Sequence, residues 1–336
     1  PWRKKENQNF YRIWISEVML QQTQVKTAIP YYNKFLKKWP DLDSFYKATL
    51  DDILLEWQGM GYYQRAKNLY LAKEFIKKNK FIIDPVNLKK IPGIGDYISC
   101  AIPAILEDQS CTVLDGNIKR IIKRYFDLNE SDKSFKTNVE EIAHKLTPKK
   151  NNRDYCQSLM DLANIVCKAK VPECEICPVS QDCRSKGNHS NKRVKFFHKF
   201  KKRKIGVAFL LEYKDEWLIE HTEKRLLQGL YAFPMTDLIE EESKGLGEKY
   251  FTDLILKWKK KHYIKTNHQM IGFVKHSFSH FNLKLLTVNI KLNEKIKFKN
   301  LHWMKVKNFK KKPVSTLDKK INRIIFMGIW KRTIYR

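Results

Sequence analysis

Leu88-Lys-Lys-Ile-Pro-Gly-Ile-Gly-Asp-Tyr-Ile-Ser99 is the stretch that decides the fold of the first half of this chain. It predicts a helix, a tight turn and a second helix. Gly93 and Gly95 allow the sharp turn and leave backbone amides exposed at the start of the second helix. Such amides suit a phosphate of the DNA backbone, as in a helix-hairpin-helix motif, which holds DNA without reading its bases. An ordinary corner between two helices is the alternative interpretation of this stretch taken alone.

The residues on either side of this stretch divide the chain into a helical half and a mixed half. Apolar residues at three- and four-residue spacing predict helices at 9–20, 23–38, 50–58, 64–79, 97–105, 117–126 and 134–146. Alternating residues predict a hairpin of two strands at 206–213 and 217–221, and a further strand at 284–291. We therefore expect a multidomain protein with an all-α domain at 1–190, a basic linker at 191–204 and an α+β domain at 205–336.

The charge of the chain predicts the chemistry of its partner. The 336 residues carry a formal net charge of +30, of which +8 lies in 1–190, +8 in 191–204 and +14 in 205–336. A chain this basic, with no apolar run long enough to cross a membrane, is expected to bind a polyanion, and nucleic acid is the first candidate. A general bias toward Lys is the alternative. Charge alone does not distinguish DNA from RNA or from anionic lipid.

Seven cysteines are present, and four of them form one compact loop. These four are Cys167, Cys174, Cys177 and Cys183, with six, two and five residues between them. A single run of four thiolates resembles the ligand set of a [4Fe-4S] cluster more than the paired motifs of zinc sites. The odd cysteine count and the absence of a secretory signal argue against disulfides. The remaining three, Cys100, Cys111 and Cys156, lie among apolar residues and are expected to be small core side chains.

Two carboxylates in the helical half are candidates for catalysis. Glu17 lies among large apolar residues, where loss of solvent would raise its pKa and allow it to act as a general acid. Asp115 stands just before a helix rich in Lys and Arg, where it could stabilise positive charge developing on a sugar. Taken singly, each has a simpler interpretation. Glu17 would be an exposed helix acid, and Asp115 an N-cap worth about 1 kcal/mol.

Taken together, these segments resemble the MutY family of adenine DNA glycosylases, within the helix-hairpin-helix glycosylase superfamily. The family-specific pieces are Pro1-Trp2-Arg3, Ser16-Glu-Val-Met-Leu-Gln-Gln-Thr-Gln-Val25, Trp57-Gln-Gly-Met-Gly-Tyr-Tyr-Gln-Arg-Ala-Lys-Asn-Leu69, Leu114-Asp-Gly-Asn117 and the cysteine loop. The resemblance covers nearly the whole chain. Endonuclease III relatives share the hairpin, the aspartate and the cluster, but they typically carry a nucleophilic lysine where this chain has Tyr97.

The resemblance implies removal of adenine mispaired with 8-oxoguanine, or with guanine, from duplex DNA by a monomeric, monofunctional hydrolase of N-glycosyl bonds. Glu17 would protonate the flipped adenine, and Asp115 would face the oxocarbenium-like sugar, with Tyr97 and Asn117 in support. It further implies that Trp2, Arg3 and Gln157 line the adenine pocket. Gln22, Thr23 and Tyr62 would wedge the duplex, and the four cysteines would hold a [4Fe-4S] cluster that takes no part in hydrolysis.

The second half resembles the Nudix-like C-terminal domain of the same family, through the stretches 224–234 and His276-Ser-Phe-Ser-His-Phe281. The Glu-rich helix with which a working Nudix hydrolase holds Mg²⁺ does not follow Pro234, and the acidic run at 240–242 is interpreted as solvated surface. The domain is therefore expected to recognise rather than hydrolyse. The resemblance implies that the loop of Phe278, Ser279 and His280 contacts 8-oxoguanine.

The sequence departs from the family pattern at three places, and two other classes of function are alternatives. Asp96 places a carboxylate beside the expected phosphate site and should weaken the hairpin's grip, whereas Tyr231 and Ala163-Asn164 are expected to alter packing only. The other functions are an endonuclease III-like glycosylase and lyase acting on oxidised pyrimidines, and a catalytically silent iron–sulfur DNA-binding module. The lack of a signal sequence and the use of reduced thiols favour the cytoplasm of a bacterium, at the nucleoid, or else a nucleus or organelle.

Overall fold

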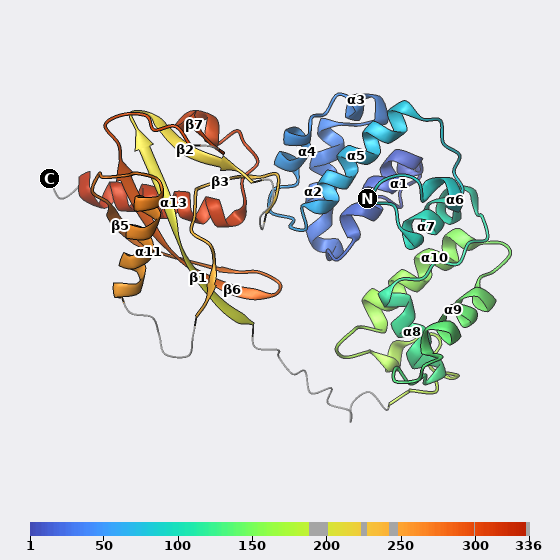
Figure 1. Ribbon diagram of the computed structural model, residues 1–336. Coiled ribbons are helices and arrows are strands. Elements are labelled where there is room, and N and C mark those ends of the chain that lie inside the picture. The colour runs from blue at the N-terminus through green and yellow to red at the C-terminus, as the bar shows by residue number, and fades with distance from the viewer. Residues whose placement is uncertain (188–200, 223–226, 242–247, 299, 334–336) are drawn as a thin grey trace. The chain divides into compact units, whose positions relative to one another are not determined.

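The computed structural model describes residues 1–187, 201–222, 227–241, 248–298 and 300–333 (Figure 1). Most of the predicted linker at 191–204, the first part of the stretch at 224–234, and Glu242 therefore lie outside the described residues. The chain forms two compact units, Pro1–Thr49 with Gln64–Phe196, and Leu50–Tyr63 with Phe197–Arg336. The segment Leu50–Tyr63 thus groups with the second unit, while the domain boundaries expected from the sequence stay a prediction.

Helices account for nearly all the regular structure of the first 187 residues (Figure 1). The α-helices are α1 (Phe10–Leu20), α2 (Val25–Lys38), α3 (Leu42–Tyr46), α4 (Leu50–Glu56), α5 (Gln64–Lys78), α6 (Pro85–Leu88), α7 (Asp96–Glu107), α8 (Gly116–Phe126), α9 (Phe135–Leu146) and α10 (Asn152–Asp161). A π-helical turn, Leu162–Val166, continues α10, and short 3-10 turns lie at Lys5–Asn7 and Cys174–Ile176. The predicted helices are confirmed to within a few residues at each end, and the helix expected before the glycine turn is α6, which ends at Leu88. α3 and α10 were not predicted.

An aromatic cluster forms the core of the first unit. Phe45 is fully buried, and its ring centroid lies 5.4 Å from that of Phe35, 5.7 Å from that of Trp39 and 6.2 Å from that of Trp14. The rings are tilted or edge-on, which is the arrangement that aromatic quadrupoles prefer. This packing fixes α1 against α2 and α3, and α1 is the helix that carries Glu17.

The glycine turn has the geometry that its sequence predicts. Asp84 caps α6 by accepting bonds from the backbone amides of Val86 and Asn87, both at 2.9 Å. Gly93 has a φ of +81°, and a Cβ there would lie 2.5 Å from the Cβ of Asn68, so only glycine fits without a shift of the helix behind it. Gly95 is the N-cap of α7 and faces open space. The turn therefore presents exposed amides at the start of α7.

A mixed sheet organises the second unit. Its strands are β1 (Lys202–Tyr213), β2 (Glu216–His221), β3 (Tyr231–Ala232), β4 (Ile239–Glu240), β5 (Gln269–Ser277), β6 (Phe281–Lys291) and β7 (Leu301–Lys305). The order is β3-β2-β1-β6-β5, with β4 paired to β1 and β7 paired to β2. β1 and β6 run parallel over eleven residue pairs, from Lys202 opposite Phe281 to Glu212 opposite Lys291. The predicted β1–β2 hairpin and the predicted strand at 284–291 are confirmed, the latter as part of β6.

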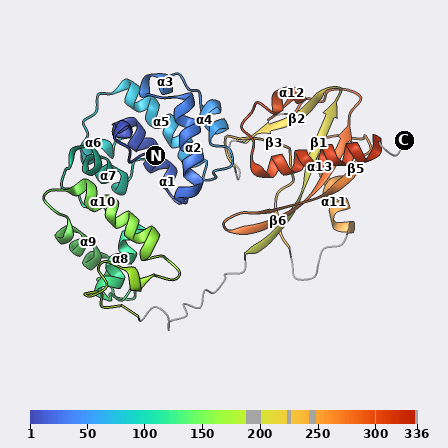
Figure 2. The ribbon, with the colours of Figure 1, turned by 180° about the vertical axis from the view of Figure 1, so that it is seen from behind.

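Helices cover both faces of this sheet. α13 (Thr316–Thr333) and α12 (Val306–Phe309) pack on the face that includes Ala208 and Leu210, and α13 runs across that face in Figure 2. α11 (Glu248–Lys261) packs on the opposite face through Phe251 and Ile255. The expected fold class, an all-α region followed by an α+β region, is confirmed. No helix among the described residues has the length and apolarity needed to cross a bilayer.

The structure corrects the interpretation of two cysteines. Cys100 on α7 and Cys111, in the segment that leads to Asp115, form a disulfide with their Cα atoms 5.3 Å apart. The sequence predicted two separate core thiols and no disulfide, from the odd cysteine count and the absence of a secretory signal. The pairing depends on how the chain turns after α7, which brings together two positions that are eleven apart in the sequence. Cys156 is a buried free thiol, as predicted.

Candidate functional site

Glu17 lies at the centre of a buried polar cluster in the first unit. It occupies the middle of α1 between apolar residues, and its exposed fraction is only 9%. Burial raises its pKa to about 7, and the negative charge of Asp115 adds to the rise. A hydrogen bond with Tyr97 and the positive charge of Arg3 act in the opposite direction. A carboxyl group with this pKa can hold or release a proton near neutral pH. The interpretation of Glu17 as an exposed helix acid is therefore wrong.

Tyr97 connects Glu17 to α10. It is the second residue of α7, directly after the glycine turn, and its hydroxyl hydrogen-bonds the Glu17 carboxyl and also Cys156. Burial raises the pKa of Tyr97 well above its ordinary value, so the phenol keeps its proton and acts as a donor to Glu17. Burial also raises the pKa of the Cys156 thiol to about 12, with further increases from the charges of Glu17 and Asp115. Cys156 therefore lies in the cluster as a neutral thiol.

Asp115 is both a helix cap and a member of the cluster. Its Oδ1 accepts bonds from the backbone amides of Asn117 and Ile118 at 2.9 and 2.8 Å, which makes it the N-cap of α8. The Asn117 side-chain amide donates to the other oxygen at 2.9 Å. These bonds fix the orientation of the carboxylate within electrostatic range of Glu17. The N-cap interpretation is confirmed, and the catalytic role of Asp115 stays a prediction.

The N-terminal segment closes the cluster through a long-range ion pair. Arg3 donates to both carboxylate oxygens of Asp161 at 2.6 and 2.7 Å, and more weakly to the backbone carbonyl of Gln157 at 3.4 Å. The side chains of this pair are each about half exposed, at 44% and 45%. Trp2 packs edge-on against Tyr32 at 5.5 Å. Asp161 was not among the predicted residues, because no local pattern links it to a residue 158 positions earlier.

The segment after α1 is held by a residue that the sequence did not single out. Gln22 is exposed with a φ of +55°, and the Thr23 hydroxyl bonds the carbonyl of Gln21 at 3.4 Å. Arg65, buried in α5, donates to the carbonyls of Val18, Met19 and Gln21 at 3.1, 2.8 and 2.6 Å. It thereby binds the carbonyl groups at the end of α1, which have no partner within the helix. The side chains of Gln22 and Thr23 extend from this fixed turn.

Tyr62 lies in the segment that groups with the second unit. Its side chain is 51% exposed and its φ is +49°, in the left-handed region that non-glycine residues seldom occupy. An exposed aromatic ring on a strained backbone suits a residue that inserts into a ligand. Its joint action with Gln22 and Thr23 stays a prediction.

Asp96 places a negative charge on the hairpin surface that is expected to bind a DNA phosphate. This first residue of α7 is exposed and accepts an ion pair from Lys89 at 2.6 Å. The ion pair neutralises the Asp96 carboxylate, but it also engages Lys89, a cation that would otherwise be available to a DNA phosphate. Exposed ion pairs contribute little to stability, so Lys89 can leave Asp96 at small cost.

The four predicted ligand cysteines line one cavity. Cys167, Cys174, Cys177 and Cys183 border it together with Arg124 and Pro172. Burial raises the pKa of the Cys183 thiol, and the other three cysteines add to the rise, so the four sulfur atoms interact electrostatically. Among the described residues, no three His, Cys, Asp or Glu side chains converge closely enough to share a single metal ion.

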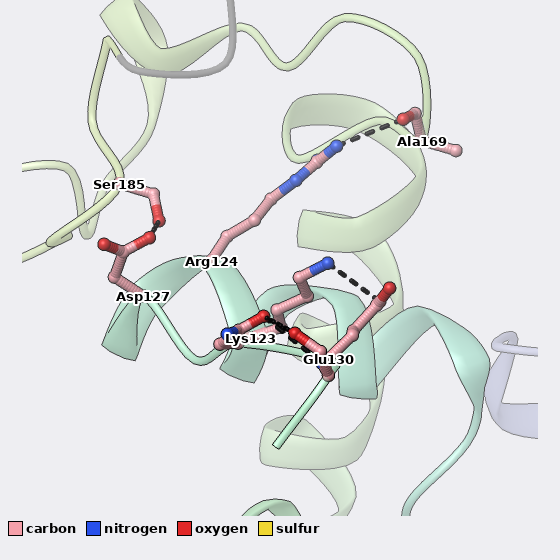
Figure 3. Close-up of polar contacts among 8 residues, drawn as sticks. Lys123, Arg124, Asp127, Glu130, Ala169 and Ser185 are labelled. Carbon is pink, nitrogen blue, oxygen red and sulfur yellow. Dashed lines mark hydrogen bonds and ion pairs between the residues drawn. The ribbon is translucent and has the colours of Figure 1, made fainter. Parts of the chain in front are cut away.

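Two arginines on α8 fix the cysteine loop. Arg124 donates to the backbone carbonyls of Lys168 at 2.7 Å and Ala169 at 3.1 Å, and it also reaches the Cys167 sulfur at 3.4 Å. Figure 3 shows Arg124 extending from α8 to Ala169, with Ser185 beside Asp127 at the other end of the loop, where the hydroxyl donates at 2.9 Å. These contacts attach the loop to the helix that Asp115 caps.

Arg120 lies one turn earlier on α8. It donates to the side chain of Asn117 at 2.9 Å and to the carbonyls of Ala163 and Cys167 at 3.0 and 3.1 Å. The π-helical turn that contains Ala163 is therefore bonded both to the cysteine loop and to a residue of the polar cluster. The sequence did not single out Arg120 or Arg124, because both belong to a helix that is rich in Lys and Arg.

The Phe278–His280 loop connects β5 to β6 in the second unit. The amide of Phe278 donates to the carbonyl of Phe281 at 2.8 Å, which closes a tight turn. The Phe278 ring packs at 4.5 Å from His276 and 4.8 Å from Phe281 and joins the core on the α13 face. Ser279 and His280 are exposed at the tip. The ring of Phe278 thus anchors the loop, and the two polar residues are the ones most available to a ligand.

Comparison with known proteins gives matches over both halves of the chain. Residues 15–149 match the model of the HhH-GPD superfamily of base excision DNA repair proteins, and residues 206–323 match that of the NUDIX domain. The chain is 33% identical over 325 residues to a protein of Buchnera aphidicola subsp. Schizaphis graminum named adenine DNA glycosylase, covering 92% of this chain and 88% of that protein. The protein of the same name from Buchnera aphidicola subsp. Acyrthosiphon pisum is 34% identical over 300 residues, covering 87% and 82%.

Proposed function

This chain belongs to the adenine DNA glycosylase family, and on that premise we propose that it hydrolyses the N-glycosidic bond of adenine mispaired with 8-oxoguanine, or with guanine, in duplex DNA. One observation carries the proposal. Glu17 is buried, has a pKa of about 7, and lies within electrostatic range of a second carboxylate, Asp115. Protonation of the leaving base requires a group that still holds a proton at neutral pH, which is Glu17. Stabilisation of a cationic sugar requires a fixed negative charge nearby, which is Asp115.

The reaction begins with extrusion of the adenine from the helical stack, because its glycosidic bond cannot be reached inside the duplex. Protonated Glu17 donates to the purine ring, so the base departs as a neutral molecule. Asp115, oriented by Asn117, stabilises the oxocarbenium-like sugar. Deprotonated Glu17 then takes a proton from the attacking water. Tyr97 supports Glu17 by donating to its carboxylate once the proton has left.

Recognition of the lesion uses residues from several segments. Trp2, Arg3 and Gln157 line the adenine pocket, and the Arg3 ion pair with Asp161 orders this side of it. Gln22, Thr23 and Tyr62 wedge the duplex beside the extruded base. The turn at Gly93 and Gly95 holds a backbone phosphate through the amides at the start of α7. Phe278, Ser279 and His280 contact 8-oxoguanine on the opposite strand.

The cysteine loop fits a [4Fe-4S] cluster held by Cys167, Cys174, Cys177 and Cys183. All four are soft thiol donors, and they border one cavity, which is the chemistry and placement that a [4Fe-4S] cluster would need. When bound, the cluster supplies a structural brace for the loop that Arg124 and Arg120 attach to α8, and hydrolysis does not pass through it.

The protein acts as a monomer on DNA, at the nucleoid of a bacterial cytoplasm or in a nucleus or organelle. Tyr97 stands where a lyase would carry its lysine nucleophile, so we expect base release without strand cleavage. A catalytically silent DNA-binding module would share the fold but would not need Glu17.

The test is single-turnover release of adenine from a duplex with one adenine opposite 8-oxoguanine, run beside adenine opposite guanine and an oxidised-pyrimidine duplex. We expect selective adenine release that Glu17→Gln abolishes while duplex binding remains within a few-fold. Glu140→Gln, on the exposed surface of α9, is the matched control and should be unchanged. Tight binding without release by the unmodified protein would overturn the enzyme assignment in favour of the silent module, and cleavage of the pyrimidine duplex would favour the lyase.

A further inference from the structure

A pocket with an unusual concentration of positive charge lies at the start of β6 in the second unit. The lining residues are Arg203, Lys204, Glu241, Lys275, His276, Ser277, Asn282, Leu283, Lys284 and Lys320. We refer to it as the basic pocket. Five cationic residues line it, against a single acid, Glu241, among the described residues. Arg203, Lys275 and Lys284 lie on the α11 face of the sheet, whereas Lys204 and Lys320 belong to the α13 face. The pocket borders the Phe278–His280 loop, because Ser277 comes directly before the loop and Asn282 soon after it.

The strand register places like charges side by side. Lys275 on β5 lies directly opposite Lys284 on β6. Directly opposed residues on neighbouring strands share a face of the sheet, and like charges there are destabilising. Two residues along, on the same face, Ser277 lies opposite Asn282, and Asn282 lies opposite Arg203 on β1. Three adjacent strands thus contribute cations or hydrogen-bond donors to one surface.

Local contacts hold these side chains without neutralising them. The Lys284 ammonium lies 4.4 Å from the Phe273 ring centroid, and the Lys204 ammonium lies 5.0 Å from that of Phe281. None of the ion pairs among the described residues involves the five cations of the basic pocket. Glu241 in the lining and Glu240, which interacts with Lys204, are described acids nearby, so the positive charge of the cluster is only partly offset.

A hydrogen-bond donor completes the surface. The Ser277 hydroxyl donates to Oδ1 of Asn282 at 2.8 Å, so the amide NH₂ of Asn282 is the end of that side chain that can donate to an anion. Lysines, an arginine and an amide donor in one open pocket match the contacts that proteins make with backbone phosphates.

We propose that the basic pocket binds the phosphate backbone of the DNA strand whose base meets the Phe278–His280 loop. The inference rests on the proposed function and adds a phosphate contact to it. A nucleotide is the less favoured occupant, because Nudix hydrolases hold their nucleoside diphosphate with Mg²⁺ on a Glu-rich helix, and α11 carries a Lys-rich sequence instead. An open pocket beside a base-contacting loop suits a continuous strand.

The experiment measures DNA affinity of the full chain as a function of salt. In one variant Lys275→Ala and Lys284→Ala are combined. The matched control combines Lys291→Ala and Lys305→Ala, which removes the same charge from exposed positions at the far ends of β6 and β7. Each lost phosphate contact lowers the slope of log Kd against log salt by about 0.9, so two lost contacts lower it by about 1.8. We expect this drop in the pocket variant and a much smaller one in the control.

Three further measurements keep the result interpretable. The variant with Lys275→Arg and Lys284→Arg keeps the charge and should keep the original salt slope, which separates a lost contact from a misfolded sheet. Adenine release by the control variant, with Lys291→Ala and Lys305→Ala, should match that of the unmodified protein at saturating enzyme, because neither residue lines the pocket. Binding of ATP and of pyrophosphate is measured in parallel.

Failure of this inference is distinguishable from failure of the proposed function. If the unmodified protein releases no adenine, the proposed function is wrong. The slope of log Kd against log salt still tests whether the pocket binds DNA. An unchanged slope in the pocket variant, or an equal drop in the control, overturns the phosphate contact. Binding of ATP that the pocket variant loses while its DNA slope is unchanged would assign the pocket to a free nucleotide instead.

Discussion

Replacing Tyr97 by Phe is expected to move the pH dependence of adenine release to higher pH. Glu17 acts as an acid only while it is protonated, and its pKa is about 7. Release should therefore be level at low pH and fall about 50-fold between pH 7 and pH 9 in the unmodified protein. The Tyr97 hydrogen bond lowers the pKa of Glu17 by stabilising its charged form. Loss of this bond must therefore raise the pKa.

The size of the shift follows from the strength of the bond. A hydrogen bond to a charged group contributes about 1.5–3 kcal/mol, and one pKa unit corresponds to about 1.4 kcal/mol. At the lower end of that range, the pKa of Glu17 rises by about one unit in Tyr97→Phe. The fall in rate between pH 7 and pH 9 then shrinks from about 50-fold to about 10-fold.

The assay is single-turnover adenine release at saturating enzyme across pH 5 to about 9.5, so that binding does not enter the profile. Tyr155→Phe is the matched control, because Tyr155 lies on α10 beside Cys156 and burial likewise raises its pKa, but Glu17 is not among the groups that affect it. A basic limb that stays in place in Tyr97→Phe, or moves to lower pH, would refute the role of Tyr97 in stabilising charged Glu17.

The remaining predictions concern the hairpin and the disulfide. Gly93→Ala should destabilise the protein by about 1–3 kcal/mol and weaken duplex binding, because the new Cβ meets Asn68 and the φ is left-handed. Gly95→Ala, whose Cβ meets nothing within 4 Å, should leave thermal melting nearly unchanged, and an equal loss of stability would contradict the geometry of the turn. Thiol titration of the denatured, metal-free protein prepared without reductant should give five free thiols if Cys100 and Cys111 are paired, and seven would contradict the pairing.

Local sequence was sufficient for the helical elements and for the glycine turn. Helices such as α1 and α8 follow from apolar residues at helical spacing and from side chains that cap the first turn, both of which act within a few residues. Gly93 was identified for the same reason, because a tight turn between two helices needs a left-handed residue. α10 was missed because its sequence is largely polar and only Asn152 and Cys156 are buried on it.

The chemistry of the cluster around Glu17 was only partly readable. The resemblance to a known family singled out Glu17, Tyr97, Asp115 and Asn117, but the sequence around Glu17 left its burial open. The raised pKa depends on groups brought from α7, α8 and the N-terminal segment, and desolvation is the sum of everything packed around a group. Asp161 was missed for the same reason, since its partner Arg3 is close only in the folded chain.

By itself, the sequence determined the helical and mixed halves of this protein, the hairpin turn and the spacing of four cysteines, because periodicity, capping and loop length act over a few residues. Only the tertiary structure decided that Glu17 is buried, that Cys100 meets Cys111, and that Lys275 lies opposite Lys284. These features depend on strand register and on packing between distant segments. Electrostatic energies change steeply with such distances, so no local pattern specifies them.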